Sequence, residues 1–338
     1  MNNQVKQYIS FLMALVFYFA YLQAKPNTQK VNNGKKIIWI NEISSSTINA
    51  PDKSLFESLK DIIFGSVEIR LSKPFSVYVK DLQNILIFDQ ENGGIINIAE
   101  TKKGYSIKKV IDAGKFPSLI SAAYFERNKL LFTDSQKNKI YCLDLDKKQT
   151  VPFNDSLLLN RPTGIAYNPK TSTIWVVETG LHRITVLDSK GKVIKHIGKR
   201  GVEAGDFNFP TFICINEEGF VYIVDSMNFR IQIFTPDGLF KSVFGQAGDA
   251  SGYFGRPKGI ATDSYGNIYV VDALFHTVQV FDVQGNLLTY FGSPGHNKGE
   301  LWVPEGIFID KNNTIFIADS YNSRVQVFQL ITREKADF

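Results

Sequence analysis

Three acidic residues are each followed, five positions later, by an arginine. The pairs are Glu178 and Arg183, Asp225 and Arg230, and Asp319 and Arg324. Such pairs form charge-assisted hydrogen bonds, which serve either catalysis or the stability of a turn. An enzyme needs a catalytic group once, whereas these pairs return once in each of several repeats. We therefore expect them to be structural pairs that hold the connection between two strands.

The chain also has four histidines and two cysteines. His182 and His276 occupy the same repeat position two repeats apart, so we do not expect them to bind one metal ion together. Cys142 and Cys214 lie in apolar runs of different repeats and are expected to be buried free thiols. The sequence has no paired-cysteine, HExxH or GxxxxGK motif. It therefore predicts no metal site, no other cofactor and no catalytic residue.

Composition indicates a folded protein. Of the 338 residues, 44% are hydrophobic and 13% are aromatic, which supports a large packed core. The net charge of +5 is modest, whereas nucleic-acid binding usually needs a dense basic face. We therefore expect no nucleic-acid partner.

The first residues differ from the rest of the chain. Lys6 precedes an apolar run from Tyr8 to Leu22, and Ala24 follows it closely. This pattern predicts a secretory signal over residues 1–24. An uncleaved membrane anchor is the alternative, and it would tether the protein to the membrane. Either case places the domain outside the cytoplasm, in the periplasm or at the extracytoplasmic face of the inner membrane.

An acidic residue recurs every 44 to 47 positions and marks six units: Asp89, Asp134, Glu178, Asp225, Asp272 and Asp319. Each unit is expected to open on a proline: Pro74, Pro117, Pro162, Pro210, Pro257 or Pro304. It then contains four short runs rich in Val, Ile, Tyr and Phe, which is typical of strands. Many runs are apolar on both faces, as in sheets covered on both sides. The pattern predicts an all-β, six-bladed propeller of four-stranded blades over residues 36–330.

The ring of blades must close. The last unit ends after its third strand, near Leu330, and residues 36–43 are strand-like. We expect this N-terminal strand to become the fourth strand of the last blade, which would remove the open sheet edges. Residues 44–73 interrupt the repeat and contain a predicted short amphipathic helix over 54–65. It could dock on the propeller or contact a partner or the membrane. Residues 331–338 are expected to be a C-terminal tail.

The repeat resembles the NHL-repeat propellers. The motif that carries the resemblance begins with Pro257, Gly259 and Ala261 and continues through Phe281 to Gly292. It covers roughly residues 36–330, and the first two units diverge, with Gly94 and Lys139 where arginine is expected. The resemblance implies the fold and leaves the function open, because one propeller fold hosts many activities.

In such propellers the residue after each strand-opening proline lies near the central axis. These positions hold Phe75, Ser118, Thr163, Thr211, Lys258 and Glu305. We expect Thr163, Thr211, Lys258 and Glu305 to line the channel mouth, where they could bind a small polar ligand or an ion. The alternative is that Lys258 and Glu305 only pair with each other. The related peptide-amidating lyase propellers have metal-binding histidines at these positions, and this chain has none there.

Loops on one face could contact a protein or peptide. The candidate contact residues are Met227, Phe229, Leu274, Phe275, His276 and Tyr321. Other loop aromatics, namely Phe209, Phe254 and Trp302, are expected at equivalent places, where they fill gaps between blades.

The sequence thus favours an exported, monomeric binding or scaffold propeller that recognises a protein or peptide in the cell envelope. The alternative is a metal-dependent lyase or hydrolase with its site at the channel mouth.

Overall fold

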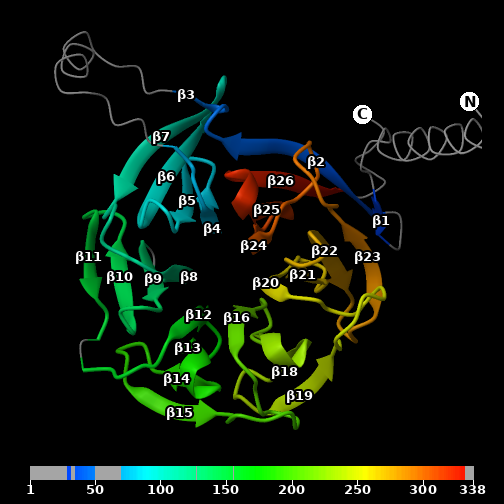
Figure 1. Ribbon diagram of the computed structural model, residues 1–338. Coiled ribbons are helices and arrows are strands. Elements are labelled where there is room, and N and C mark those ends of the chain that lie inside the picture. The colour runs from blue at the N-terminus through cyan, green and yellow to red at the C-terminus, as the bar shows by residue number, and fades with distance from the viewer. Residues whose placement is uncertain (1–28, 32–34, 50–69, 127, 155, 332–338) are drawn as a thin grey trace, which may run out of the picture.

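The strands form six sheets arranged around a central axis as the blades of a propeller (Figure 1). The computed structural model describes residues 29–31, 35–49, 70–126, 128–154 and 156–331. The all-β, six-bladed prediction is therefore confirmed. The predicted helix over 54–65, the signal segment 1–24 and most of the tail 331–338 lie outside the described residues. Within the described ranges, no helix is long and apolar enough to span a bilayer.

The first three blades each run outward from an inner strand. Blade 1 contains β4 (Pro74–Asp81), β5 (Asn84–Asp89), β6 (Gly94–Thr101) and β7 (Gly104–Ile111), and the short β3 (Ile48–Asn49) lies parallel to β7. Blade 2 contains β8 (Leu119–Phe125), β9 (Lys129–Asp134), β10 (Lys139–Asp144) and β11 (Gln149–Pro152). Blade 3 contains β12 (Pro162–Asn168), β13 (Thr173–Glu178), β14 (Arg183–Leu187) and β15 (Val193–Ile197).

The last three blades follow the same plan. Blade 4 contains β16 (Pro210–Ile215), β17 (Val221–Asp225), β18 (Arg230–Phe234) and β19 (Phe240–Phe244). Blade 5 contains β20 (Pro257–Thr262), β21 (Ile268–Asp272), β22 (Thr277–Phe281) and β23 (Leu287–Phe291). Blade 6 contains β24 (Pro304–Ile309), β25 (Thr314–Asp319), β26 (Arg324–Ile331) and β2 (Lys35–Ser44), with β1 (Gln29–Val31) outermost.

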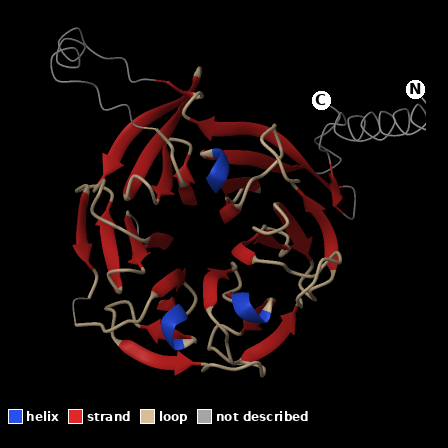
Figure 2. Ribbon diagram, in the orientation of Figure 1, coloured by secondary structure: helices blue, strands red, loops and turns tan. Residues whose placement is uncertain are grey.

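Short helical turns connect the second and third strands of three blades (Figure 2). They are η1 (Thr179–Leu181), η2 (Ser226–Asn228) and η3 (Ser320–Asn322). Each is followed by a residue in the left-handed region, with φ of 53° at His182, 54° at Phe229 and 53° at Ser323. His276 has the same conformation in blade 5, with φ of 54°. The turn between the second and third strands therefore has the same backbone conformation in blades 3 to 6, although the residue type in the left-handed region differs.

Burial decreases from the second strand of a blade to the fourth. All residues of β17 and β21 are buried, whereas β19 is largely exposed. Neighbouring blades cover both faces of the second strand, so apolar residues can occupy every position there. The hydrophobic clusters accordingly lie between consecutive blades. Each blade packs one of its two faces against the blade before it and the other against the blade after it.

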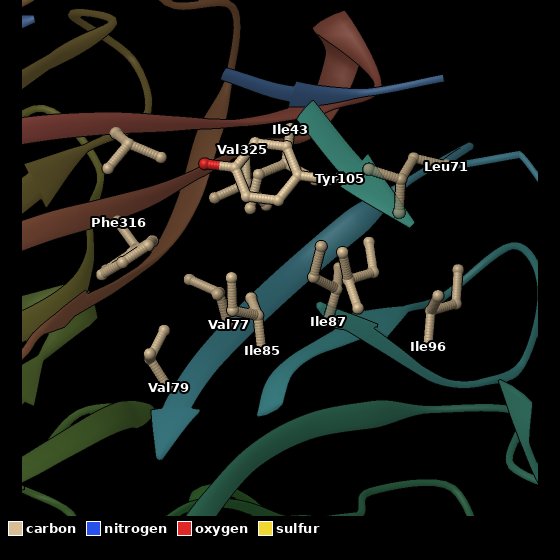
Figure 3. Close-up of a cluster of buried hydrophobic side chains, with 12 residues drawn as sticks. Ile43, Leu71, Val77, Val79, Ile85, Ile87, Ile96, Tyr105, Phe316 and Val325 are labelled. Carbon is tan, nitrogen blue, oxygen red and sulfur yellow. The ribbon is translucent and has the colours of Figure 1, made fainter. Parts of the chain in front are cut away.

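The N-terminal strand closes the ring as predicted. β2 pairs antiparallel with β26, with Ile37 opposite Leu330 and Ile43 opposite Val325. Ile43 and Val325 then meet the strands of blade 1 in one buried cluster, which includes Val77 (Figure 3). The two ends of the ring are thus joined by backbone hydrogen bonds within blade 6 and by side-chain packing between blades 6 and 1.

Blade 2 departs from the predicted register. Leu119, not Pro117, pairs with Asp134 in the way that Pro74 pairs with Asp89 in blade 1. The inner position expected for Ser118 is therefore filled by Ile120. The spacing explains the error, because Pro117 precedes its acidic residue by 17 positions, whereas the other prolines do so by 15 or 16.

Candidate functional site

Two threonines predicted at the channel mouth are engaged in hydrogen bonds, one to the neighbouring blade and one within its own blade. Thr163 Oγ1 donates a hydrogen bond of 2.8 Å to the carbonyl of Thr211, and it lies 2.7 Å from Thr179 Oγ1. Thr211 Oγ1 lies 2.5 Å from Ser226 Oγ. A hydroxyl has one proton to donate, so these contacts occupy much of its bonding capacity. The two threonines therefore connect blades 3 and 4 within the wall of the channel.

The other two predicted mouth residues form an ion pair between blades 5 and 6. Lys258 Nζ lies 3.0 Å from Glu305 Oε2, and both side chains are largely buried. The contact is not aligned as a hydrogen bond, so Glu305 Oε2 receives no hydrogen bond from the described residues. Ser320 Oγ, in the turn of the same blade, is also buried without a described partner. The mouth therefore keeps hydrogen-bonding capacity on its blade 6 side.

A central cavity follows the inner strands away from this mouth. Its volume is about 230 Å³, and its wall includes Tyr78, Tyr124 and Tyr167 from blades 1 to 3. Tyr78 accepts a hydrogen bond of 2.6 Å from the backbone N–H of Ala122, whereas the buried Tyr124 hydroxyl has no described partner. Burial raises the pKa of both phenols. They stay protonated near neutral pH, so the cavity is a weakly polar space without a charged group on its wall. Sequence reasoning did not identify it.

The recurring acid–arginine pairs are all present. The Nε of Arg183, Arg230 and Arg324 lies 2.8 Å from a carboxylate oxygen of Glu178, Asp225 and Asp319, respectively. Each carboxylate is fully buried. Arg230 and Arg324 also donate to carbonyl groups of the loop before their blade. The pairs thus fix the turn after the second strand, and in blades 4 and 6 they also fix the loop before the blade.

Three of the six predicted contact residues project into solvent. Met227 is 53% exposed, Leu274 58% and Tyr321 59%. The loops between blades add further exposed apolar residues, and Met227 N donates to Asn208 O of one such loop at 3.0 Å. We define the apolar loop face by these exposed side chains: Leu181, Val202, Met227, Tyr253, Leu274, Trp302 and Tyr321. Four of them are not among the predicted contact residues, and Leu181 could be found from the sequence because it lies in the equivalent turn of blade 3.

The other three predicted contact residues are partly buried. His276 Nδ1 accepts the backbone N–H of Val303 at 2.9 Å, and its ring stacks on Trp302 at 4.8 Å. His182 makes the same contact with the N–H of Phe209, at 3.1 Å. Phe229 and Phe275 are likewise partly buried. His276 therefore connects blade 5 to blade 6 and has only part of its ring available to a partner.

The expected equivalence of three loop aromatics is wrong. Phe207, Phe254 and Leu301 occupy the equivalent, fully buried places, each 47 positions after the last. Phe209 and Trp302 instead pack on the two histidines. The spacing of 47 positions between repeats identifies the equivalent residues, whereas aromatic character alone does not.

Reactive and metal-binding groups are dispersed in the described part of the chain. No three His, Cys, Asp or Glu side chains are placed there to hold a metal ion. Cys142 in blade 2 and Cys214 in blade 4 are free thiols, and burial raises the pKa of both.

Comparisons with known proteins agree with this geometry. The NHL repeat family model matches residues 207–234 and 301–328, in blades 4 and 6. The chain is a six-bladed propeller that contains NHL repeats in these two blades. A 68-residue stretch is 34% identical to the human E3 ubiquitin-protein ligase NHLRC1, and it spans 20% of this NHL propeller and 17% of the ligase.

Solved structures share the fold. An auxiliary nutrient binding protein from Bacteroides thetaiotaomicron matches with a TM-score of 0.61 and 14% identity, over 77% of this NHL propeller and 69% of that chain. A virginiamycin B lyase from Staphylococcus aureus matches with a TM-score of 0.55 and 17% identity, over 78% and 96%. At these identities the likeness establishes the fold of the NHL propeller, which is compatible with binding proteins and with a lyase.

Proposed function

We propose that this NHL propeller is an exported, non-enzymatic binding or scaffold protein that recognises a protein or peptide partner in the cell envelope. The observation that carries the proposal is the apolar loop face, whose side chains come from four consecutive blades. Large apolar groups on one face are typical of interaction surfaces, whereas scattered ones need no explanation. Similarity to proteins described as nutrient binding supports a binding role.

Export rests on the first 24 residues and is tested separately from binding. Fractionation of cells that make the full chain should place it in the envelope. Mass spectrometry of its N-terminus distinguishes a cleaved signal from a retained anchor. Recovery of the full-length chain in the cytoplasm would contradict export.

Binding is tested by crosslinking in intact cells. A photoreactive residue in place of Met227 or Tyr321 should capture one partner. The matched control is Leu239, which is 64% exposed in the β18–β19 hairpin turn at the other end of blade 4. Met227→Ser and Tyr321→Ser should then weaken binding of the purified partner, and Leu239→Ser should not. Equal capture from both ends of the blade would contradict the proposal.

A second function is favoured by Ser320 Oγ, which is buried without a described partner, and by Glu305, whose Oε2 lies 3.0 Å from Lys258 Nζ but accepts no hydrogen bond from the described residues. In this alternative the channel mouth binds a small ligand or a metal ion and acts as a lyase or hydrolase. Metal analysis of the purified protein tests it: a metal present at one equivalent, and lost in Glu305→Gln, would support the alternative.

A further inference from the structure

Blade 4 binds a guanidinium group in a cage of carbonyl oxygens. Arg230 Nε donates to Asp225 at 2.8 Å. Its Nη1 donates to Val202 O at 2.6 Å, and its Nη2 donates to Glu203 O at 2.8 Å and to Asp206 O at 2.9 Å. The cage thus matches the planar, multiple-donor geometry of a guanidinium.

Blade 6 repeats the arrangement. Arg324 Nε donates to Asp319 at 2.8 Å, and its Nη2 donates to Asn297 O and Glu300 O, both at 2.9 Å. The acceptors lie 27 and 24 positions before the arginine, as in blade 4. The cage is therefore a property of the repeat and not of one blade.

Blade 5 lacks the arginine and keeps the loop. Thr277 occupies the arginine position, opposite Asp272 in the β21–β22 register. The loop before blade 5 keeps the hydrogen bonds of its counterparts: Tyr253 N donates to Ala250 O at 2.9 Å, and Gly252 N donates to Gln279 Oε1 at 2.9 Å. The corresponding hydrogen bonds measure 3.1 and 2.8 Å in blade 4, and both hydrogen bonds are also present in blade 6. The carbonyl positions of the cage are thus retained.

The shorter threonine leaves a cavity of about 350 Å³ in place of the arginine side chain. The cavity is lined by loop residues of the cage, including Asp249, Ala250 and Tyr253. Two further aromatic rings, those of Phe275 and Tyr290, also line it. Tyr253 and Tyr290 are partly exposed, so the cavity is open to solvent.

The cavity has the chemistry of a cation site. Ala250 O and Tyr253 O each accept one hydrogen bond from the chain. In blade 4, the matching carbonyls of Glu203 and Asp206 accept an equivalent bond and a bond from the guanidinium as well. A carbonyl oxygen has two lone pairs, so the blade 5 carbonyls can accept a further donor. Aromatic faces add attraction for a cation.

The charge of the site points in the same direction. Asp272 is not in the cavity wall but lies opposite Thr277, which is. It is fully buried and accepts four backbone N–H groups, from Gly255, Arg256, Leu274 and Phe275. Unlike Asp225 and Asp319, it forms no ion pair with a described side chain. The exposed Asp249 adds a second carboxylate at the rim.

We propose that this cavity binds the guanidinium group of an arginine side chain presented by the protein or peptide partner. The inference deepens the proposed function and rests on it, because the cavity adjoins Leu274 and Tyr253 of the apolar loop face. A guanidinium fits better than an ammonium group, since its fork can reach several carbonyls while its flat face meets the aromatic rings.

The first test uses the purified protein and no partner. Binding of Nα-acetyl-arginine-methylamide is measured by NMR titration, with the lysine analogue at equal ionic strength for comparison. We expect the arginine analogue to bind about tenfold more tightly than the lysine analogue, a difference near 1.4 kcal/mol. Equal binding of the two analogues, or no binding, would overturn the inference.

Two substitutions test whether the arginine analogue binds in the cavity beside Thr277. Thr277→Arg supplies the chain's own guanidinium and should abolish binding of the arginine analogue, while thermal unfolding stays at or above the wild-type temperature. Thr277→Ser keeps the cavity and should keep binding. Unchanged binding in Thr277→Arg would locate the arginine elsewhere and overturn the inference.

The crosslinked partner separates this inference from the proposed function. Suppose that Thr277→Arg binds the partner as the wild type does and Tyr321→Ser does not. This result would support partner binding by the apolar loop face and contradict the arginine site. If Thr277→Arg loses both the partner and the arginine analogue, and an arginine of the partner is needed, the site is supported. An arginine-containing peptide from the partner should then bind more tightly than free arginine.

Discussion

Arg324 and Glu42 lie 282 positions apart in the chain, and Arg324 Nη1 is 3.0 Å from Glu42 Oε2. The same guanidinium bonds to Asp319 and to the loop before blade 6. One side chain therefore connects the last turn of the repeat, the loop that leads to it and the N-terminal strand that closes the ring. The closing strand is part of the same polar network as the repeat motif.

The closing strand should contribute strongly to stability through its buried face. Ile43 is fully buried between blades 6 and 1, whereas Ile40 in the same strand is 44% exposed. Ile43→Ala should lower the free energy of unfolding by about 2–5 kcal/mol, because it leaves a cavity in a packed interface. Ile40→Ala is the matched control and should change it by about 0.5 kcal/mol or less. Denaturant unfolding measures both, and equal effects would show that the ring does not depend on this packing.

The arginine cage predicts unequal roles for two arginines of the same motif. Arg230 bonds to a carboxylate and to three carbonyls, whereas the bond of Arg183 is to Glu178. Arg230→Ala leaves a buried carboxylate without its cation and should destabilise the protein by about 3–5 kcal/mol. Arg183→Ala should have a smaller effect, since the Arg183 side chain is more exposed. Urea unfolding of both variants makes the comparison, and a larger loss in Arg183→Ala would contradict it.

Much of the fold could be predicted because a propeller repeats its signals. The acidic residue and the buried second strand return in each unit, and the arginine returns in three of the six, so local errors do not change the number of blades. The closing strand could be predicted because the last unit has three strands in the sequence and needs a fourth. In blade 2 the predicted register is wrong, because Pro117 lies 17 positions before Asp134 and Leu119 takes the place of the strand-opening proline.

The candidate sites were predicted less well than the fold, for a physical reason. Spacing shows which residues share a position, but it does not show which of their atoms are already bonded. Thr163 and His276 hold the positions expected, yet each is engaged by a neighbouring blade. The cavity beside Thr277 depends on a side chain that is shorter than its counterparts, within a loop that keeps their backbone hydrogen bonds. Its polar lining becomes visible only when the three loops are compared in space.

Lys258 and Glu305, which form the ion pair at the channel mouth, should make coupled contributions to stability. Lys258→Met leaves the largely buried Glu305 without its cation and should destabilise the protein by about 3–5 kcal/mol. The double variant Lys258→Met/Glu305→Leu removes both charges and should recover most of that loss. A double-mutant cycle by denaturant unfolding should give a coupling energy of about 0.5–3 kcal/mol. Additive effects would mean that the two groups do not stabilise each other.

The interblade histidines should make stability depend on pH. Burial lowers the pKa of His182 and His276 below the usual value near 6.5, and the carboxylates of Asp272 and Asp319 oppose this shift at His276. Both side chains accept a backbone N–H at Nδ1, so the neutral form suits the folded state. As the pH falls below about 6.5, the unfolded chain binds protons at these histidines before the folded chain does. The free energy of unfolding should therefore be highest above that pH and fall steadily as the pH drops through the folded-state pKa.

Replacing both histidines with asparagine isolates this effect. Asparagine tolerates the left-handed conformation of these positions and offers a carbonyl oxygen to the same N–H, but it does not titrate. The double variant should lose less stability between pH 7.5 and 5 than the wild type does, because two histidines with lowered pKa values are removed. His196, whose pKa burial also lowers, remains in both proteins, and the aspartates with lowered pKa values act mainly at lower pH. Unfolding curves at several pH values measure the difference. A wild type and a variant with the same slope would show that the protons are taken up elsewhere.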